Sequence, residues 1–238
     1  MKLDVLAFGA HPDDVEISAG GTVASLVAQG KKVGIVDLTR GELGTRGSAD
    51  LRDEESEASA KILGLAVREN LGLADGFFQA CPESIRAVIA EIRRFRPEIV
   101  LCNSVTDRHP DHGKGSSLVK EACFLSGLRK IETAWNGDQQ EHWRPRAVYH
   151  FIQDYYLQPD VVVDISDFLE VKMDSIKAYS SQFFDPNSNE PNTPISGEEF
   201  FDLLKGRALQ MGRPAGFLYG EGFNVERYPG VKSLFDLY

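Results

Sequence analysis

The sequence lacks the features that mark secreted, disulfide-stabilised or membrane proteins. It has only three cysteines, Cys81, Cys102 and Cys123, which form no CxxC pair, so we interpret them as small thiols without a function. No apolar stretch approaches the length that crosses a bilayer, and the first residues lack the charged and apolar regions of a signal peptide. We therefore expect a cytoplasmic protein that does not bind a membrane.

Basic residues are also few, and they do not gather in one part of the chain. The 26 lysines and arginines are outnumbered by 36 aspartates and glutamates, which gives a net charge of −10. Because proteins that bind nucleic acids or anionic membranes present a basic patch, this distribution argues against both kinds of partner. The 238 residues, 42% of them hydrophobic, are enough for one large domain over residues 1–238.

Short apolar runs alternate with helical patterns along the chain. This alternation is typical of βαβ units and predicts an α/β, Rossmann-like three-layer fold with a mostly parallel sheet in a single domain. The expected strands cover residues 3–9, 33–38, 67–71, 99–102, 147–152 and 161–165. The expected helices cover residues 20–29, 50–63, 85–95, 112–126, 167–181 and 197–211.

Two irregular segments are candidates for a binding site. Residues 39–48 follow a predicted strand and contain three glycines and two arginines, which favours a binding loop at the edge of the sheet. Residues 185–194 are rich in proline and asparagine, and we expect them to cover the site or to form a contact between subunits.

A histidine and two carboxylates stand at the exit of the first predicted strand. They belong to the segment His11-Pro12-Asp13-Asp14, which follows the apolar run at 3–9. This loop is not a dinucleotide-binding fingerprint, because it lacks GxGxxG and because adjacent carboxylates would repel a pyrophosphate. His11 and Asp14 are three residues apart, so one turn can direct both toward a metal ion while Asp13 points elsewhere.

A second polar cluster follows the predicted strand at 99–102. His109 and His112 are also three residues apart, with Pro110 and Asp111 between them. One imidazole can complete a metal site with the first cluster, and the other can face the reacting group. Because the carboxyl ends of neighbouring parallel strands meet, the two clusters predict a metal site with two histidines and one carboxylate. Three protein ligands leave a position open for water, as in catalytic metal sites.

These motifs resemble those of the PIG-L/LmbE-like family of metal-dependent N-deacetylases, in which an AHPDD-type loop is followed by HPDH. The likeness covers nearly the whole chain and extends to the bacillithiol-biosynthesis branch. The segments that carry it are GAHPDDVE at 9–16, LRDEE at 51–55, DRHPDH at 107–112 and YSSQF at 179–183. The resemblance implies a zinc-dependent hydrolase that deacetylates N-acetylglucosaminyl malate. Another N-acetylglucosamine conjugate or a chitooligosaccharide is the alternative substrate.

The resemblance implies His11, Asp14 and His112 as the zinc ligands. Two histidines and one carboxylate suit Fe²⁺ as well as Zn²⁺, so the ligand types leave the metal open. The resemblance further implies a homo-oligomer, expected to be a hexamer, although no sequence pattern shows an interface.

The resemblance also implies Asp13 as the general base and His109 as the acid and oxyanion stabiliser, with Asp111 orienting His109. These roles agree with the chemistry, because a metal ion acidifies water and polarises the acetamide carbonyl while a base takes the water proton. The amine leaves once it is protonated, and either His109 or the protonated Asp13 can supply that proton.

Three arginines are candidates for substrate binding. Arg52 matches a family position that holds substrate hydroxyls. A malyl group presents two carboxylates, for which a guanidinium is a suitable bidentate partner. Arg108 adjoins His109, and Arg46 lies in the glycine-rich segment, so we expect one of them on the malyl group.

Two other classes of function fit the motifs less well. A phosphoesterase with two metal ions needs further ligands, and no third cluster stands at a predicted strand end. A sugar-binding protein without catalysis would need neither Asp13 nor His109. A turnover assay with and without metal separates both from a deacetylase.

Overall fold

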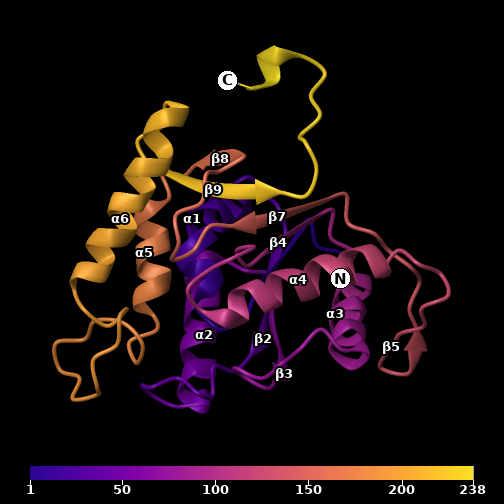
Figure 1. Ribbon diagram of the computed structural model, residues 1–238, viewed down its shortest axis with the longest axis horizontal. Helices are drawn as coiled ribbons and strands as arrows, with labels where there is room; N and C mark the ends of the chain where they lie inside the picture. The colour runs from indigo at the N-terminus through magenta and orange to yellow at the C-terminus, as the bar shows by residue number, and fades with distance from the viewer. Residues whose placement is uncertain (238) are drawn as a thin grey trace.

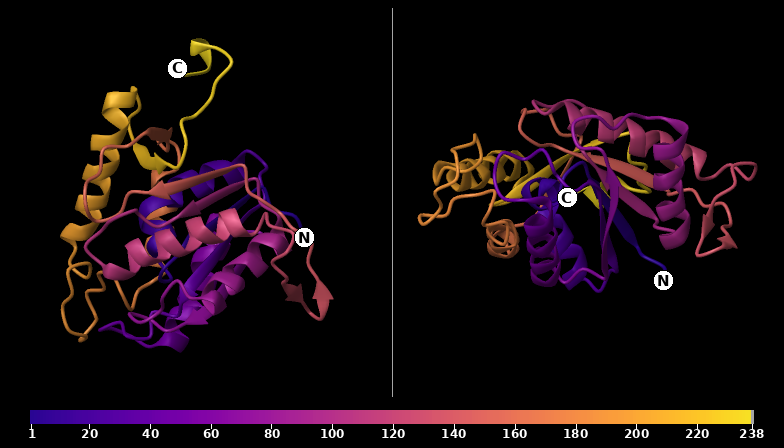
Figure 2. Two further views of the ribbon diagram at one scale, coloured as in Figure 1. Left: turned by 45° about the vertical axis from the view of Figure 1, so that its right-hand side comes forward. Right: turned by 90° about the horizontal axis from the view of Figure 1, so that it is seen from below.

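The polypeptide is organised around a seven-stranded sheet with helices on both faces (Figures 1 and 2). The computed structural model describes residues 1–237. The strand order is β3-β2-β1-β4-β7-β9-β8, in which β9 is antiparallel to both neighbours and the other pairs are parallel. This arrangement confirms the predicted α/β fold with a mostly parallel sheet. Its strands are β1 (Val5–Gly9), β2 (Val33–Thr39), β3 (Val67–Leu73), β4 (Ile99–Cys102), β7 (Ala147–Phe151), β8 (Val161–Asp164) and β9 (Gly220–Val225).

The helices form the two outer layers. One face is covered by α1 (Asp14–Ala28), α2 (Ala49–Leu63) and α5 (Leu169–Lys177), and the other by α3 (Pro82–Phe95) and α4 (Pro110–Leu125). α6 (Glu199–Gly212) packs against β9 and lies beside α5 in Figure 1. Short pieces complete the fold, namely the hairpin of β5 (Ala134–Trp135) and β6 (Asp138–Gln139) and the 3₁₀ turns Arg213–Ala215 and Leu234–Leu237. Within residues 1–237, no helix is both long and apolar enough to span a bilayer.

The central strand β1 divides the core into two layers. Leu6 and Phe8 pack in one cluster with the apolar sides of α3 and α4, whereas Val5 and Ala7 pack in the other with α1. Every residue of β1 is buried, as is usual for strands of a parallel sheet that is covered on both faces. The two layers together hold β1 rigidly, so the loop that follows it starts from a fixed point.

The first helix begins earlier than its predicted start at residue 20. α1 starts at Asp14 and runs through the glycine pair Gly20-Gly21, where the sequence pattern predicts its beginning. A Cβ at Gly21 would lie 2.8 Å from the side chain of Ile165, so the glycine serves close packing inside the helix. α4 likewise starts at Pro110 instead of residue 112, because proline is well suited to the first turn of a helix.

The last strand, β9, is absent from the strands predicted from the sequence. β9 contains two glycines and a glutamate, which weaken its strand signal. Glu221 is buried, accepts hydrogen bonds from the amides of Gly21 and Thr22 at 3.0 and 2.7 Å, and pairs with Lys172 at 2.6 Å. Through Glu221, β9 therefore ties α1 to α5.

The strand order reverses direction at β1. The chain proceeds from β1 to β2 on one side, and β4 lies against β1 on the other side. Ligands of open α/β sheets bind at such a switch point, beyond the carboxyl ends of the strands. Both polar clusters of the sequence follow these two strands, so the topology places them side by side.

Candidate functional site

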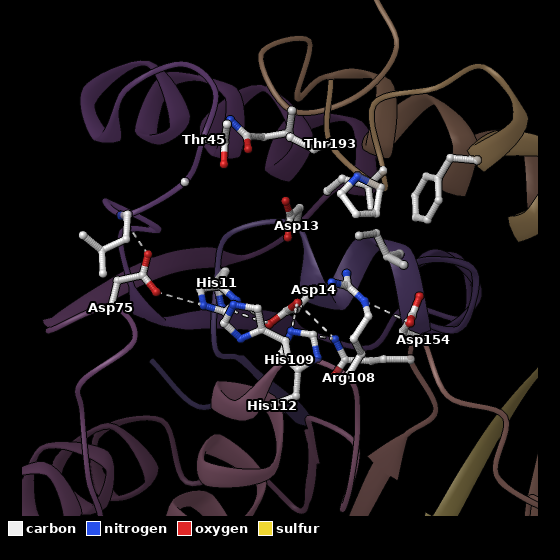
Figure 3. A pocket seen from close by; sticks show the side chains of 18 of the residues that line it. His11, Asp13, Asp14, Thr45, Asp75, Arg108, His109, His112, Asp154 and Thr193 are labelled. Atoms are coloured by element: carbon white, nitrogen blue, oxygen red, sulfur yellow. Dashed lines mark hydrogen bonds and ion pairs between the residues drawn. The ribbon is translucent and has the colours of Figure 1, made fainter. Parts of the chain in front are cut away.

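Two loops bring three histidines together beyond β1 and β4 (Figure 3). His11 belongs to the loop between β1 and α1, and His109 and His112 belong to the beginning of α4. The ring centroids of His11 and His109 are 4.6 Å apart, and those of His109 and His112 are 5.1 Å apart. The two sequence clusters thus form one group of side chains.

The backbone at Asp13 separates two adjacent carboxylates. Asp13 has φ of 115° and ψ of −25°, a left-handed conformation that residues with a side chain seldom adopt. After this turn the carboxylate of Asp14 accepts a hydrogen bond from the amide of His11 at 2.9 Å. Figure 3 shows Asp14 among the histidines and Asp13 apart from them, toward the opposite side of the cavity. The two carboxylates can therefore have different roles, Asp14 beside the histidines and Asp13 apart from them.

Further carboxylates orient the rings of His11 and His112. Nε2 of His11 faces Asp75 at 3.1 Å, and Nδ1 of His112 faces Asp107. With the ring proton on the nitrogen that faces Asp75 or Asp107, the second nitrogen, Nδ1 of His11 or Nε2 of His112, can offer its lone pair to a metal ion. These two nitrogens are 3.5 and 3.1 Å from the carboxylate of Asp14. Two imidazole lone pairs and one carboxylate thus converge, which is a suitable donor set for a divalent metal ion.

His11 also takes part in two wider groups of potential ligands. In each group, one ligand atom of every residue lies within 4.8 Å of the others. The groups are His11 with His109 and His112, and His11 with Asp75 and Asp111. The residues present therefore fit a metal ion near His11, on the chemistry of their donors.

Two buried amides hold the Asp14 carboxylate. Asn103 donates from Nδ2 to Asp14 Oδ2 at 2.9 Å, and Gln153 donates from Nε2 to Asp14 Oδ1 at 3.0 Å. The two amides are joined by a hydrogen bond from Asn103 to Oε1 of Gln153. Burial alone would raise the pKa of Asp14, but His112 and His11 lower it well below its usual range. The carboxylate is thus held ionised and in one orientation.

His109 and Asp111 interact differently from the predicted pair. The carboxylate of Asp111 accepts from Lys114 at 2.9 Å and from the amide of Gly76 at 2.7 Å. Its contact with His109 runs through the main chain, because the Asp111 amide donates to Nδ1 of His109 at 3.3 Å. A backbone amide thus orients the ring and leaves Nε2 as its donor. Burial and the two neighbouring histidines lower the pKa of His109.

Asp13 is a buried carboxyl group beside the buried side chain of Arg52. Burial raises the pKa of Asp13 to about 7, while Arg52 opposes this rise and Asp14 adds to it. A carboxyl group that exchanges its proton near neutral pH is suited to general acid and base catalysis.

The group of histidines lines a cavity of about 420 Å³. Two of the three predicted arginines, Arg52 and Arg108, also line it. Arg108 donates from Nε to Asp154 at 3.1 Å. Arg46 lies outside the lining, because its guanidinium is buried against Ser188, to which it donates at 2.6 Å. The structure therefore does not bring Arg46 to the cavity.

Both irregular segments of the sequence reach the cavity. They contribute Leu43, Gly44, Thr45, Thr193 and Pro194 to its lining. A Cβ at Gly44 would lie 3.1 Å from Nη2 of Arg52, so the glycine leaves room for the guanidinium. The expectation that these segments border the site thus agrees with the geometry.

Several polar residues of the site were not singled out in the sequence. They are Asp75, Asn103, Asp107 and Gln153. Each follows a strand by a few residues: β3 in the first case, β4 in the next two and β7 in the last. A search of every predicted strand end, including those without a histidine, would have found them.

Comparisons with known proteins identify relatives of this chain by sequence and by structure. The model of a family described as GlcNAc-PI de-N-acetylase, PIG-L, matches residues 6–123. Diacetylchitobiose deacetylase from Thermococcus kodakarensis is 31% identical over 238 residues, which cover 95% of this chain and 84% of that protein. A 1D-myo-inositol 2-acetamido-2-deoxy-alpha-D-glucopyranoside deacetylase from Acidothermus cellulolyticus is 26% identical over 274 residues, 89% of this chain and 92% of that protein. The crystal structure of the conserved protein TT1542 from Thermus thermophilus matches with a TM-score of 0.86 and 33% identity, over 98% of both chains.

Proposed function

Because the chain belongs to the PIG-L family of deacetylases, hydrolases that act on amide bonds, we propose that it removes the acetyl group from an N-acetylglucosamine conjugate. One observation carries the proposal: His11, Asp14 and His112 present a metal-binding donor set, and Asp13 stands beside it in the same cavity. We propose these three residues as the metal ligands, with Zn²⁺ as the metal and Fe²⁺ as the alternative.

The remaining side chains match the steps of amide hydrolysis. A divalent ion at this site supplies Lewis acidity toward the acetamide carbonyl and toward water. Asp13 takes the proton of the attacking water, and His109 donates from Nε2 to the oxygen that becomes negative, an interaction worth about 2.7 to 4 kcal/mol in other hydrolases. Asp111 supports His109 through its amide. The leaving nitrogen receives the proton that Asp13 took from the water, while His109 keeps its single ring proton on Nε2 as a hydrogen-bond donor; both residues line the cavity.

The substrate class follows from the relatives and from the charges of the cavity. The names of the relatives point to N-acetylglucosamine conjugates, diacetylchitobiose among them, and give no support to a malyl conjugate or to bacillithiol biosynthesis. Arg108, the remaining candidate for a malyl group, is already paired with Asp154. We therefore propose the wider class, with Arg52 on the sugar hydroxyls and the whole chain acting as one deacetylase domain. A homo-oligomer, such as a hexamer, stays a prediction.

The proposal is tested by acetate release from a panel of N-acetylglucosamine conjugates, measured by mass spectrometry. We expect about one divalent ion per chain, loss of activity on chelation, and recovery with Zn²⁺ or Fe²⁺. Asp13→Asn should lower kcat by about two orders of magnitude or more and retain the metal, whereas Asp14→Ala should lose it. Full turnover of the metal-free protein, or equal metal loss in both variants, would overturn the proposal.

A further inference from the structure

The cavity has two unlike walls on either side of the histidine group. One wall is polar and carries Thr45, Arg52 and Asp75. The other, which we call the α6 wall, consists of Ile195, Phe200, Leu203 and Leu204. Figure 3 shows Asp75 on one side of the histidines and Arg108 and Asp154 on the other, and Arg207 of α6 donates to the main-chain oxygen of Asp154. A ligand that reaches the histidines therefore meets a different chemistry on each side.

The α6 wall presents apolar side chains to the cavity. Phe200 and Leu204 are buried in the cluster between α5 and α6, so they form a firm base. Leu203 lines the cavity with its side chain 49% exposed, and its neighbours Asp202 and Lys205 are exposed polar residues. An exposed leucine in the lining of a cavity adds apolar area that a bound ligand can cover.

The shape of N-acetylglucosamine determines which part of a conjugate meets this wall. The acetamido group is on C2, between the hydroxyl on C3 and the attached group on C1. When the acetamide lies at the histidines and Asp13, hydroxyls on C3 and C4 find charged partners in Arg52 and Asp75. Because C1 flanks C2 on the side opposite C3, the group on C1 in this placement extends away from Arg52 and Asp75, to the side of the α6 wall.

The charged groups beside the α6 wall are engaged with one another. Arg108 donates to the carboxylate of Asp154 at 3.1 Å, and Arg207 donates to the main-chain oxygen of Asp154 at 2.6 Å. A dicarboxylate attached at C1 would have to share these guanidinium groups with the negative carboxylate of Asp154, whereas an apolar group could cover Leu203 and leave the contacts unchanged.

We propose that the α6 wall is a subsite for an apolar group on C1, so that aryl and alkyl N-acetylglucosaminides are the conjugates this enzyme prefers. The proposal rests on the deacetylase function and narrows its substrate class. The phenyl glycoside should exceed the methyl glycoside in kcat/KM by about tenfold, equivalent to about 1.4 kcal/mol. The malyl glycoside should fall below the phenyl glycoside.

The experiment compares acetate release from the phenyl, methyl and malyl N-acetylglucosaminides, each as both anomers, with zinc-supplemented protein. Leu203→Ser should reduce the ratio of phenyl to methyl kcat/KM about fivefold. The ratio does not depend on how much of a variant is active, so partial misfolding does not imitate the effect. The control is Leu209→Ser, because Leu209 is an exposed leucine on the same helix outside the cavity lining and should keep the ratio of the parent.

A phenyl-to-methyl ratio near one in the parent protein would overturn the subsite, as would an unchanged ratio in Leu203→Ser or a preference for the malyl glycoside. Equilibrium binding of the phenyl and methyl glycosides to Asp13→Asn tests the wall without turnover. Tighter binding of the phenyl glycoside in the absence of any acetate release by the parent would uphold the subsite and reject the proposed function. Equal binding would reject the subsite.

Discussion

Replacing Arg68 by methionine tests how the support beneath the site is stabilised. Arg68 donates to both oxygens of Asp37 at 2.8 and 3.0 Å and also bonds Glu16, which lies in the first turn of α1. The side chains of Arg68, Glu16 and Asp37 are 3%, 0% and 2% exposed. Arg68→Met therefore leaves two carboxylates buried without their cation.

The expected loss of stability in Arg68→Met follows from the burial of the ion pair. Removing one partner of a buried ion pair costs about 3 to 5 kcal/mol. For a chain of this size each kcal/mol lowers Tm by about 2 to 4 °C, so we expect Arg68→Met to melt about 6 to 20 °C below the parent. The exposed ion pair of Arg40 with Asp53 provides the control, and Arg40→Met should leave Tm close to that of the parent because water already solvates both charges.

The loss of stability in Arg68→Met should also depend on pH. Burial already raises the pKa of Asp37 to about 6, although Arg68 opposes the rise, and the pKa of Asp37 should rise further in Arg68→Met. A folded-state pKa above the unfolded value gives stability that is present at low pH and is lost as the pH rises through the folded pKa. Urea denaturation at pH 5 and pH 8 should therefore show a larger deficit at pH 8. A loss no greater than that of Arg40→Met, or a deficit independent of pH, would refute the argument.

Two further predictions concern α1 and its first residue. Asn103→Ala removes a hydrogen bond to Asp14 and should weaken metal binding about 10- to 100-fold in a chelator competition, and unchanged affinity would count against this role. Gly21→Ala should destabilise the protein by about 1 to 3 kcal/mol because its Cβ would meet Ile165. Gly206→Ala in α6, where a Cβ has no neighbour within 4 Å, should stabilise it by about 0.5 to 1 kcal/mol, and calorimetry that shows the same sign for both would reject this explanation.

The fold could be predicted because its signals are local. Apolar runs such as that of β1 and the helical spacing of α3 are visible within single segments, and their alternation indicates a parallel sheet. β9 could not be predicted in this way, since a short strand with two glycines is held by its partners β7 and β8. The predicted start of α1 was wrong for a related reason. The neighbour that requires a glycine at position 21 is Ile165, which lies far along the chain.

The site residues that could be predicted are those that belong to a recognisable sequence motif. His11 and His112 stand in recognisable clusters after neighbouring strands, so their meeting follows from the topology. The partners that orient them come from elsewhere, as Asp75 does for His11, and depend on how the strands are ordered in the sheet. Asp111 shows the limit of spacing arguments, because its carboxylate turns to Lys114 although His109 is two residues away.

The position of β9 determines when, during synthesis, the protein becomes able to retain a metal ion. β8 is made before β9 but lies at the edge of the sheet, where its partner among the described strands is β9. Glu221 on β9 also binds the middle of α1, the helix that begins with Asp14. A nascent chain that has passed His112 thus carries every proposed ligand without the strand that secures their helix. We expect the ability to retain metal to arise late, when residues 220–225 have emerged from the ribosome.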